Sequence, residues 1–104
     1  MWRYFIYTDV TFEWDGRKAL RNAEKPGFTF EAARTVFFDD QALDGESAPP
    51  AGEPRHLRLG RTTGGQIAVV VYTLRCHDDE TAAIRIISAR CASRREREAY
   101  HAHD

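Results

Sequence analysis

Residues 66–75, QIAVVVYTLR, and residues 82–90, AAIRIISAR, are the stretches that decide the fold. Both are rich in apolar and β-branched residues, the composition typical of buried strands. The segment between them, 76–81, is polar and predicts a turn, so the two stretches are expected to be neighbouring strands. Residues 55–59 alternate polar and apolar side chains and predict a third strand. A glycine-containing turn at 61–65 would join this strand to the strand at 66–75. The second half of the chain therefore predicts a three-strand meander.

Two helices are expected before the meander. Asp15 is a suitable N-cap for a helix over 16–25, which Pro26-Gly27 would end. Thr29 is a suitable N-cap for a second helix, which would end at Asp39-Asp40. Both segments place apolar residues three or four positions apart, as in helices that pack on a sheet.

The end of the chain predicts a closing helix. Ser93 and Glu96 have the spacing of a capping box, in which each side chain accepts the backbone N–H of the other residue, and the helix would run to about Tyr100. The expected fold class is therefore α+β, with an antiparallel sheet, two N-terminal helices and a C-terminal helix. With 104 residues, 42% of them hydrophobic and 30% charged, the chain fits a single domain over residues 1–104.

Two segments lie outside this plan. Residues 2–14 alternate aromatic and polar side chains and predict a strand, so residues 1–11 are expected to form an extra N-terminal strand or extension. Residues 39–54 contain five acidic residues, three prolines and no basic residue, which indicates a solvated acidic loop. Such a loop either contacts a basic partner or is mobile.

The composition also bounds the environment of the protein. No stretch has the roughly 20 apolar residues of a membrane helix, and the N-terminus lacks the zones of a signal peptide, so we expect a cytoplasmic protein without a membrane partner. Cys76 and Cys91 have no metal-binding spacing and are expected to be free thiols. His101 and His103 stand at the end of the chain, where a frayed terminus is a simpler interpretation than a metal site. Because the sequence also has no glycine-rich phosphate loop, we expect no cofactor and no metal.

Arginine dominates the basic residues, since it accounts for 13 of the 15. Residues 1–54 carry six basic and ten acidic residues, a net charge of −4, whereas residues 55–104 carry nine and six, a net charge of +3. A guanidinium binds phosphate through a planar fork and stacks on bases, so the second half favours a phosphate-bearing partner. A genome of high GC content would also replace lysine by arginine, and composition alone does not separate the two interpretations.

The arginines of the meander are the first candidates for a site. Arg85 interrupts a run of isoleucines, and a charge there must either find a partner or face a groove. A simple hairpin at 76–81 would place Arg85 opposite Tyr72, in a cation–π or phosphate-facing pair. The alternative is an internal ion pair, for instance with Glu13 or Asp15.

His56 is a candidate general base. The positive charge of the adjacent Arg55 would favour the neutral imidazole, which is the form that accepts a proton. The alternative is a partly exposed strand histidine without a catalytic role, because proximity in sequence does not place it against a substrate.

The order of several motifs resembles that of the BrnT family of toxins. In the first half they are Phe12-Glu13-Trp14-Asp15, Lys18, Asn22, Lys25-x-Gly27, Phe30-Glu31-x-Ala33 and Val36-Phe37. In the meander they are Arg55, Gly60, Val69-Val70-Val71-Tyr72-Thr73 and Arg75. At the end they are Ile84-Arg85-Ile86-Ile87-Ser88-Ala89-Arg90, Ala92, Glu96-Arg97 and Tyr100. The resemblance covers residues 12–100, nearly the whole chain.

This resemblance implies a ribonuclease toxin of a type II toxin-antitoxin pair, with a fold similar to that of the RelE toxins. It implies cleavage of RNA without a metal, by attack of a 2′-hydroxyl on the adjacent phosphate, and inhibition of growth as the result. It also implies a BrnA-type antitoxin as the partner in a hetero-oligomer. Operator DNA would be contacted only indirectly, through the antitoxin.

The same resemblance gives the site residues, position by position. The catalytic candidates are Arg85, Arg90, Arg75, Arg55 and Lys18, to which the residue-level argument adds His56. The candidates for RNA binding or for a structural role are Ser88, Glu96, Arg97 and Tyr100. The chain has Lys25-Pro26-Gly27 where the family commonly has Lys-His-Gly. Either that histidine is dispensable, or His56 substitutes for it, or the protein is a weakened homologue that acts as an antitoxin-binding co-repressor.

Overall fold

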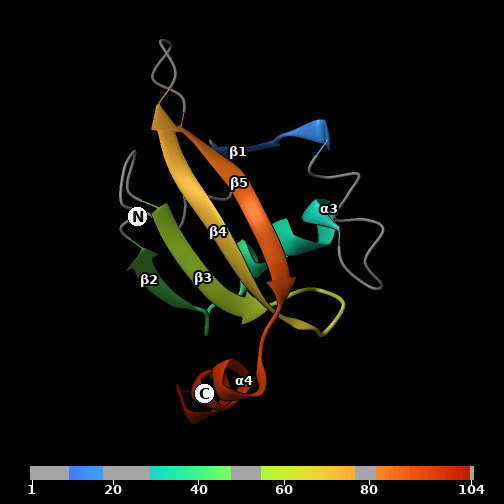
Figure 1. Cartoon of the computed structure of the whole chain (residues 1–104), viewed down its shortest axis with the longest axis vertical. Coiled ribbons are helices and arrows are strands. Elements are labelled where there is room, and N and C mark those ends of the chain that lie inside the picture. The colour runs from blue at the N-terminus through green and yellow to red at the C-terminus, as the bar shows by residue number, and fades with distance from the viewer. Residues whose placement is uncertain (1–9, 18–28, 48–54, 77–81, 104) are drawn as a thin grey trace.

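The structure, a computed structural model, describes residues 10–17, 29–47, 55–76 and 82–103. Its strands are β1 (Val10–Trp14), β2 (Leu43–Ser47), β3 (Arg55–Arg61), β4 (Ile67–Cys76) and β5 (Ala82–Cys91). Its helices are α3 (Phe30–Ala33), the 3-10 helix η1 (Arg34–Phe38) and α4 (Arg94–His103). The strands form one five-stranded sheet in the order β1-β5-β4-β3-β2 (Figure 1), which confirms the α+β class.

The central meander is confirmed, but the sheet is mixed. β3 pairs antiparallel with β4, and β4 pairs antiparallel with β5. The prediction of a purely antiparallel sheet is wrong at one edge, because β1 pairs with β5 in parallel, with Glu13 opposite Arg85. β1 and β5 are far apart in the sequence, so no hairpin turn fixes their relative direction.

β2 lies in the segment predicted to be an acidic loop, and that prediction is wrong for residues 43–47. β2 pairs antiparallel with β3, with Asp44 opposite Arg58. Nη1 of Arg58 lies 3.0 and 2.9 Å from the two carboxylate oxygens of Asp44. The backbone ladder and this ion pair hold a segment, LDGES, whose own composition has weak strand propensity. The end of the predicted loop, 48–54, lies outside the described residues.

The predicted N-caps are confirmed. Oδ1 of Asp15 accepts the backbone N–H of Arg17 at 2.8 Å, and helical backbone follows Asp15 directly. Oγ1 of Thr29 accepts the backbone N–H of Ala32 at 3.0 Å at the beginning of α3. Each cap satisfies one of the N–H groups that a helix leaves without a partner in its first turn.

The predicted pair of N-terminal helices is not matched. Between β1 and β2, the described residues contain α3 and its 3-10 continuation η1, which together replace the single α-helix expected after Thr29. The greater part of the helix predicted over 16–25 lies outside the described residues. Residues 1–9, the main part of the predicted N-terminal extension, also lie outside them.

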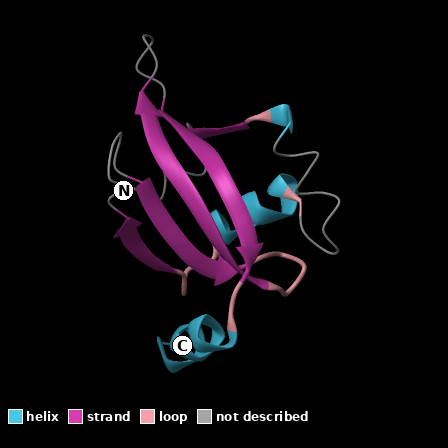
Figure 2. Ribbon diagram, viewed as in Figure 1, coloured by secondary structure: helices cyan, strands magenta, loops and turns pink. Residues whose placement is uncertain are grey.

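α3 and η1 pack on one face of the sheet and form the core with it (Figure 2). The ring of Phe37 lies 5.4 Å from that of Phe12 on β1 and 4.9 Å from that of Tyr72 on β4, measured between centroids. Burial of such apolar surface is the dominant favourable contribution to folding. The largest fully buried side chains are Ile86, Val36 and Val70.

Gly60 of β3 packs closely against Val36 of η1 and against Ala42, which leaves too little space for a side chain unless these neighbours move. An ideal Cβ at Gly60 would lie 3.1 Å from the Cβ atoms of Val36 and Ala42 and 3.3 Å from the carbonyl oxygen of Val36. We expect Gly60→Ala to lower the free energy of unfolding by about 1 to 3 kcal/mol, because η1 must move away from the sheet. Urea unfolding measures this change, and Gly45→Ala is the control, since nothing lies within 4 Å of a Cβ there. Equal stability losses in both variants would contradict the expectation.

Candidate functional site

The face of the sheet opposite to α3 and η1 carries five of the ten predicted site residues. Figure 1 views the molecule from this side, with α3 behind the sheet. Side chains alternate between the two faces along a strand, and paired residues in neighbouring strands share a face. Val70 and Tyr72 of β4 belong to the core, so the residues that alternate with them along the strand, such as Thr73 and Arg75, point to the opposite side. We call this side the arginine face; it carries Arg55, Thr73, Arg75, Arg85, Ser88 and Arg90.

A bulge in β5 brings the two arginines of that strand onto the same face. The register between β4 and β5 shifts by one residue between Val71 and Tyr72, so Ile87 is an extra residue in β5. Arg85 and Arg90 are five positions apart, and an odd separation in a regular strand would place them on opposite faces. With the extra residue, both side chains lie on the arginine face.

One cross-strand row on this face contains Glu13, Arg85 and Thr73, and Arg55 extends it on β3. Nη2 of Arg85 lies 3.4 Å from Oε2 of Glu13, which confirms the ion-pair alternative. The prediction that Arg85 lies opposite Tyr72 is wrong, because the hairpin register differs by one residue and places Thr73 there. The Arg85 side chain is still 42% exposed, so the guanidinium remains accessible to a ligand.

Thr73 is a candidate site residue that the sequence analysis did not select. It is 5% exposed, and its Oγ1 has no hydrogen-bond partner in the part of the chain that the structure describes. A buried hydroxyl in this state costs free energy, and a contact with a ligand on this face would offset that cost. A signal was present in the sequence, since Thr73 and Arg75 flank Leu74 and so give the end of this apolar strand a polar face.

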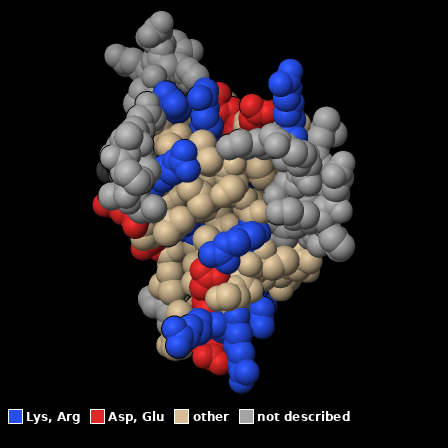
Figure 3. Space-filling view, viewed as in Figure 1, with Lys and Arg blue, Asp and Glu red and all other residues tan. Residues whose placement is uncertain are grey.

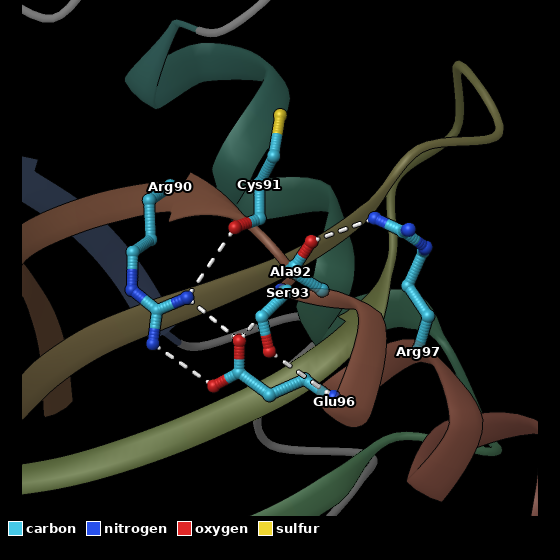
Figure 4. Close-up of polar contacts among 6 residues, drawn as sticks. All are labelled: Arg90, Cys91, Ala92, Ser93, Glu96 and Arg97. Atoms are coloured by element: carbon cyan, nitrogen blue, oxygen red, sulfur yellow. Dashed lines mark hydrogen bonds and ion pairs between the residues drawn. The ribbon is translucent and has the colours of Figure 1, made fainter.

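The other end of the arginine face is held by α4 (Figure 4). Nη1 and Nη2 of Arg90 donate to the two carboxylate oxygens of Glu96 at 2.7 and 2.9 Å, and Nη1 lies 3.3 Å from the carbonyl oxygen of Cys91. The hydrogen bonds from Arg90 lower the pKa of Glu96 to about 2, and burial only partly opposes them. The pKa of Arg90 is raised by the same bonds. Arg90 is therefore already engaged by a carboxylate.

The capping box at the beginning of α4 is confirmed. The backbone N–H of Ser93 donates to Oε1 of Glu96 at 2.8 Å, and the backbone N–H of Glu96 donates to Oγ of Ser93 at 3.2 Å. Glu96 thus joins the cap of α4 to Arg90 on β5. The capping role alone is a structural reason for a glutamate at this position.

Arg97 and Tyr100 make structural contacts of α4. Nη1 of Arg97 donates to the carbonyl oxygen of Ala92 at 2.9 Å. The hydroxyl of the buried Tyr100 donates a hydrogen bond to Oδ2 of Asp39 at 2.7 Å. Burial would raise the pKa of Asp39, but the bond from Tyr100, two backbone N–H groups and the charge of Arg58 together hold this pKa below its usual value. These contacts anchor the helix beside η1.

The structure does not bring His56 to the arginines. His56 is paired with Tyr72 and lies on the core side of the sheet, where the two rings stack with centroids 5.3 Å apart and planes 28° apart. Burial raises the pKa of Tyr72 to about 12, with a further contribution from Asp44. Lys18 lies outside the described residues.

The charge distribution follows the strands. Figure 3 shows Lys and Arg side chains gathered on this face at the top of the view and again around α4, with uncharged surface between them. Among the described residues, the upper strand ends carry Arg55, Arg75 and Arg85. In the same residues no three His, Cys, Asp or Glu side chains are placed to hold a metal ion, and Cys91 is an exposed free thiol. None of the helices described is long and apolar enough to cross a membrane.

Among the described elements, no helix packs on the central part of the arginine face, and guanidinium groups such as those on it are suited to binding phosphate. Residues 14–96 match the family described as the ribonuclease toxin, BrnT, of type II toxin-antitoxin systems. This match covers most of the chain, so the protein belongs to the BrnT toxin family, and the resemblance found in the sequence is confirmed. A comparison with curated proteins gave no match.

Proposed function

We propose that the protein is an endoribonuclease toxin that binds and cleaves RNA on the arginine face, without a metal, and inhibits growth from the cytoplasm. The chain belongs to a ribonuclease toxin family, and one structural observation gives the main support for this site. Arg55, Arg75 and Arg85, from three strands, lie around the buried hydroxyl of Thr73 at one end of the face. The family further supports a BrnA-type antitoxin as partner, a RelE-like fold, and contact with operator DNA only through that antitoxin.

The arginines fit the needs of the reaction. Attack of a 2′-hydroxyl on the adjacent phosphate adds negative charge to the phosphoryl oxygens in the transition state. Fixed guanidinium groups stabilise this charge, and their N–H groups match the geometry of phosphate oxygens. Side chains on neighbouring strands of one sheet are held more rigidly than side chains on loops. Arg85 and Arg75 are therefore the leading catalytic candidates, with Arg55 as a phosphate-binding residue.

Arg90 has a different role in this proposal. Its guanidinium is occupied by Glu96, and it lies about 13 Å along the strand from the row of Arg85, given the usual rise per residue and the bulge. This distance is about two nucleotides of an extended strand. Arg90 and the exposed Ser88 are thus placed to contact RNA beyond the cleaved phosphate.

The proposal is tested by incubating the purified protein with labelled RNA in the presence of a chelator and reading the product ends by mass spectrometry. We expect 2′,3′-cyclic phosphate and 5′-hydroxyl ends. A substrate with a 2′-deoxy nucleotide at the cleaved position is the control and should stay intact. Uncut RNA in both samples would contradict the proposal.

A second candidate function is that of a catalytically weakened homologue, an antitoxin-binding co-repressor. Pro26, which stands where the family commonly has histidine, favours it. Intact RNA in the cleavage assay, together with a change in the affinity of the antitoxin for operator DNA when this protein is added, would support this second function.

A further inference from the structure

We propose that Glu13 is the general base of the cleavage reaction. This inference rests on the proposed ribonuclease function and assigns a catalytic residue that the sequence analysis did not include in the site. The reaction needs a group that takes the proton of the attacking 2′-hydroxyl. The arginine face supplies several cations, but a guanidinium cannot accept that proton. The base must therefore be another side chain on this face.

On the described strands, Glu13 is the one carboxylate on the arginine face. Guanidinium groups keep their protons in proteins, and the hydroxyls of Thr73 and Ser88 are weak bases. The carboxylates of β2, Asp44 and Glu46, belong to the other side of the sheet, because both are paired with core-side residues of β3. Glu96 lies near the far end of the face, but both of its oxygens accept hydrogen bonds from Arg90. The composition of the face thus singles out Glu13.

The position of Glu13 fits this role. Its Oε2 lies 3.4 Å from Nη2 of Arg85, and its side chain is 31% exposed. A phosphate bound by Arg85 would therefore place the neighbouring ribose against the Glu13 carboxylate. The backbone of Glu13 is held firmly, because the flanking Phe12 and Trp14 both pack against the core. A catalytic group needs such support to keep its position within a fraction of an ångström.

The proton and electron movements are as follows. Glu13 takes the proton of the 2′-hydroxyl as O2′ forms its bond to phosphorus. The P–O5′ bond breaks, its electron pair stays on O5′, and O5′ takes a proton from water. The products are a 2′,3′-cyclic phosphate and a 5′-hydroxyl, and the protonated Glu13 then returns its proton to water. Arg85 balances the charge on the phosphoryl oxygens throughout.

The first test compares Glu13→Gln with the wild type in the RNA cleavage assay. We expect kcat to fall by about 100-fold or more, with KM little changed, because the amide keeps the size of the side chain but accepts no proton. Glu46→Gln, an exposed glutamate on the core side of the sheet, is the matched control and should cleave at the wild-type rate. Thermal unfolding of both variants verifies that they are folded, and Glu13→Asp, which keeps a carboxylate, should retain part of the activity.

The second test separates a base from a mere ion-pair partner of Arg85. For the wild type, the cleavage rate should fall as pH is lowered through the range in which carboxyl groups take up a proton, and Glu13→Gln should lack this dependence. Among the described residues, Arg85 is ion-paired with Glu13 and keeps its proton, and Asp15, two positions further along the chain, accepts the backbone N–H of Arg17 through its Oδ1. Added acetate should restore part of the activity of Glu13→Ala, and restore more of it than the less basic formate does.

The outcomes distinguish the two proposals. If the wild type leaves RNA intact, the proposed ribonuclease function fails. If the wild type cleaves RNA and folded Glu13→Gln cleaves it at the same rate, the assignment of Glu13 is overturned and the ribonuclease function stands. A loss of activity in Glu13→Gln with an unchanged pH profile would also overturn the assignment, because it would show a structural role.

Discussion

Replacement of Arg85 by alanine is expected to lower kcat/KM for RNA cleavage by about 100-fold or more. Arg85 is paired with Glu13 on one side and Thr73 on the other, at the centre of the row on the arginine face. Its guanidinium would contact the phosphate both when RNA binds and when charge develops on phosphorus. We therefore expect KM to rise and kcat to fall, in contrast to the change in kcat alone expected for Glu13→Gln.

Two controls show whether the effect of Arg85→Ala is specific. Arg94 on α4 is 87% exposed and has a salt bridge with Glu98, so Arg94→Ala removes the same charge away from the row and should keep nearly full activity. Arg85→Lys keeps the charge but loses the planar fork, and its activity should lie between those of Arg85→Ala and the wild type. Cleavage at the wild-type rate by folded Arg85→Ala would show that the row is not the site.

Replacement of Arg58 by alanine is expected to lower the free energy of unfolding by about 2 to 4 kcal/mol, the largest stability effect that we expect from a single arginine. The Arg58 side chain is only 17% exposed. Its Nε donates to the carbonyl oxygen of Val36 at 3.0 Å, its Nη2 donates to that of Asp39 at 3.1 Å, and its guanidinium lies 5.3 Å from the centre of the Phe37 ring. The substitution removes one of the hydrogen bonds to each of these two carbonyl groups and leaves a cavity beside an aromatic ring.

Asp44→Asn isolates the contribution of the ion pair. Asp44 is 52% exposed, so its salt bridge with Arg58 contributes about 1 kcal/mol or less. Urea unfolding of the two variants should therefore show a much larger loss for Arg58→Ala than for Asp44→Asn. Equal losses would mean that the salt bridge, and not the contacts with η1, accounts for the stabilisation by Arg58.

The elements that the sequence predicted correctly are those with a local signal. The apolar runs of β4 and β5 and the caps at Thr29 and Ser93 each depend on residues within a few positions of one another. β2 has no such signal, because it is formed by its backbone ladder with β3, in which Asp44 lies opposite Arg58, fourteen positions away. The parallel pairing of β1 with β5 likewise joins segments some seventy residues apart.

The candidate site was predictable in its residue types but not in its layout. Arg55, Arg75 and Arg85 were named from the sequence, and the sheet gathers them on one face. His56 was also named, but strand alternation turns it to the other side of the sheet, a result that depends on a register no local pattern gives. Thr73 was missed because a threonine in an apolar strand is typical of strands in general.

The extra residue at Ile87 sets a rule of spacing for β5. Arg85 and Arg90 share a face only because one residue between them does not take part in the alternation. The side of the sheet on which Arg90 lies therefore depends on whether Ile87 stays outside the alternation. Loss of the bulge at an unchanged chain length would return β5 to strict alternation and send Arg90, with the helix that it anchors through Glu96, to the side of the sheet occupied by the core. The bulge is thus what keeps Arg90, and through Glu96 the beginning of α4, on the arginine face.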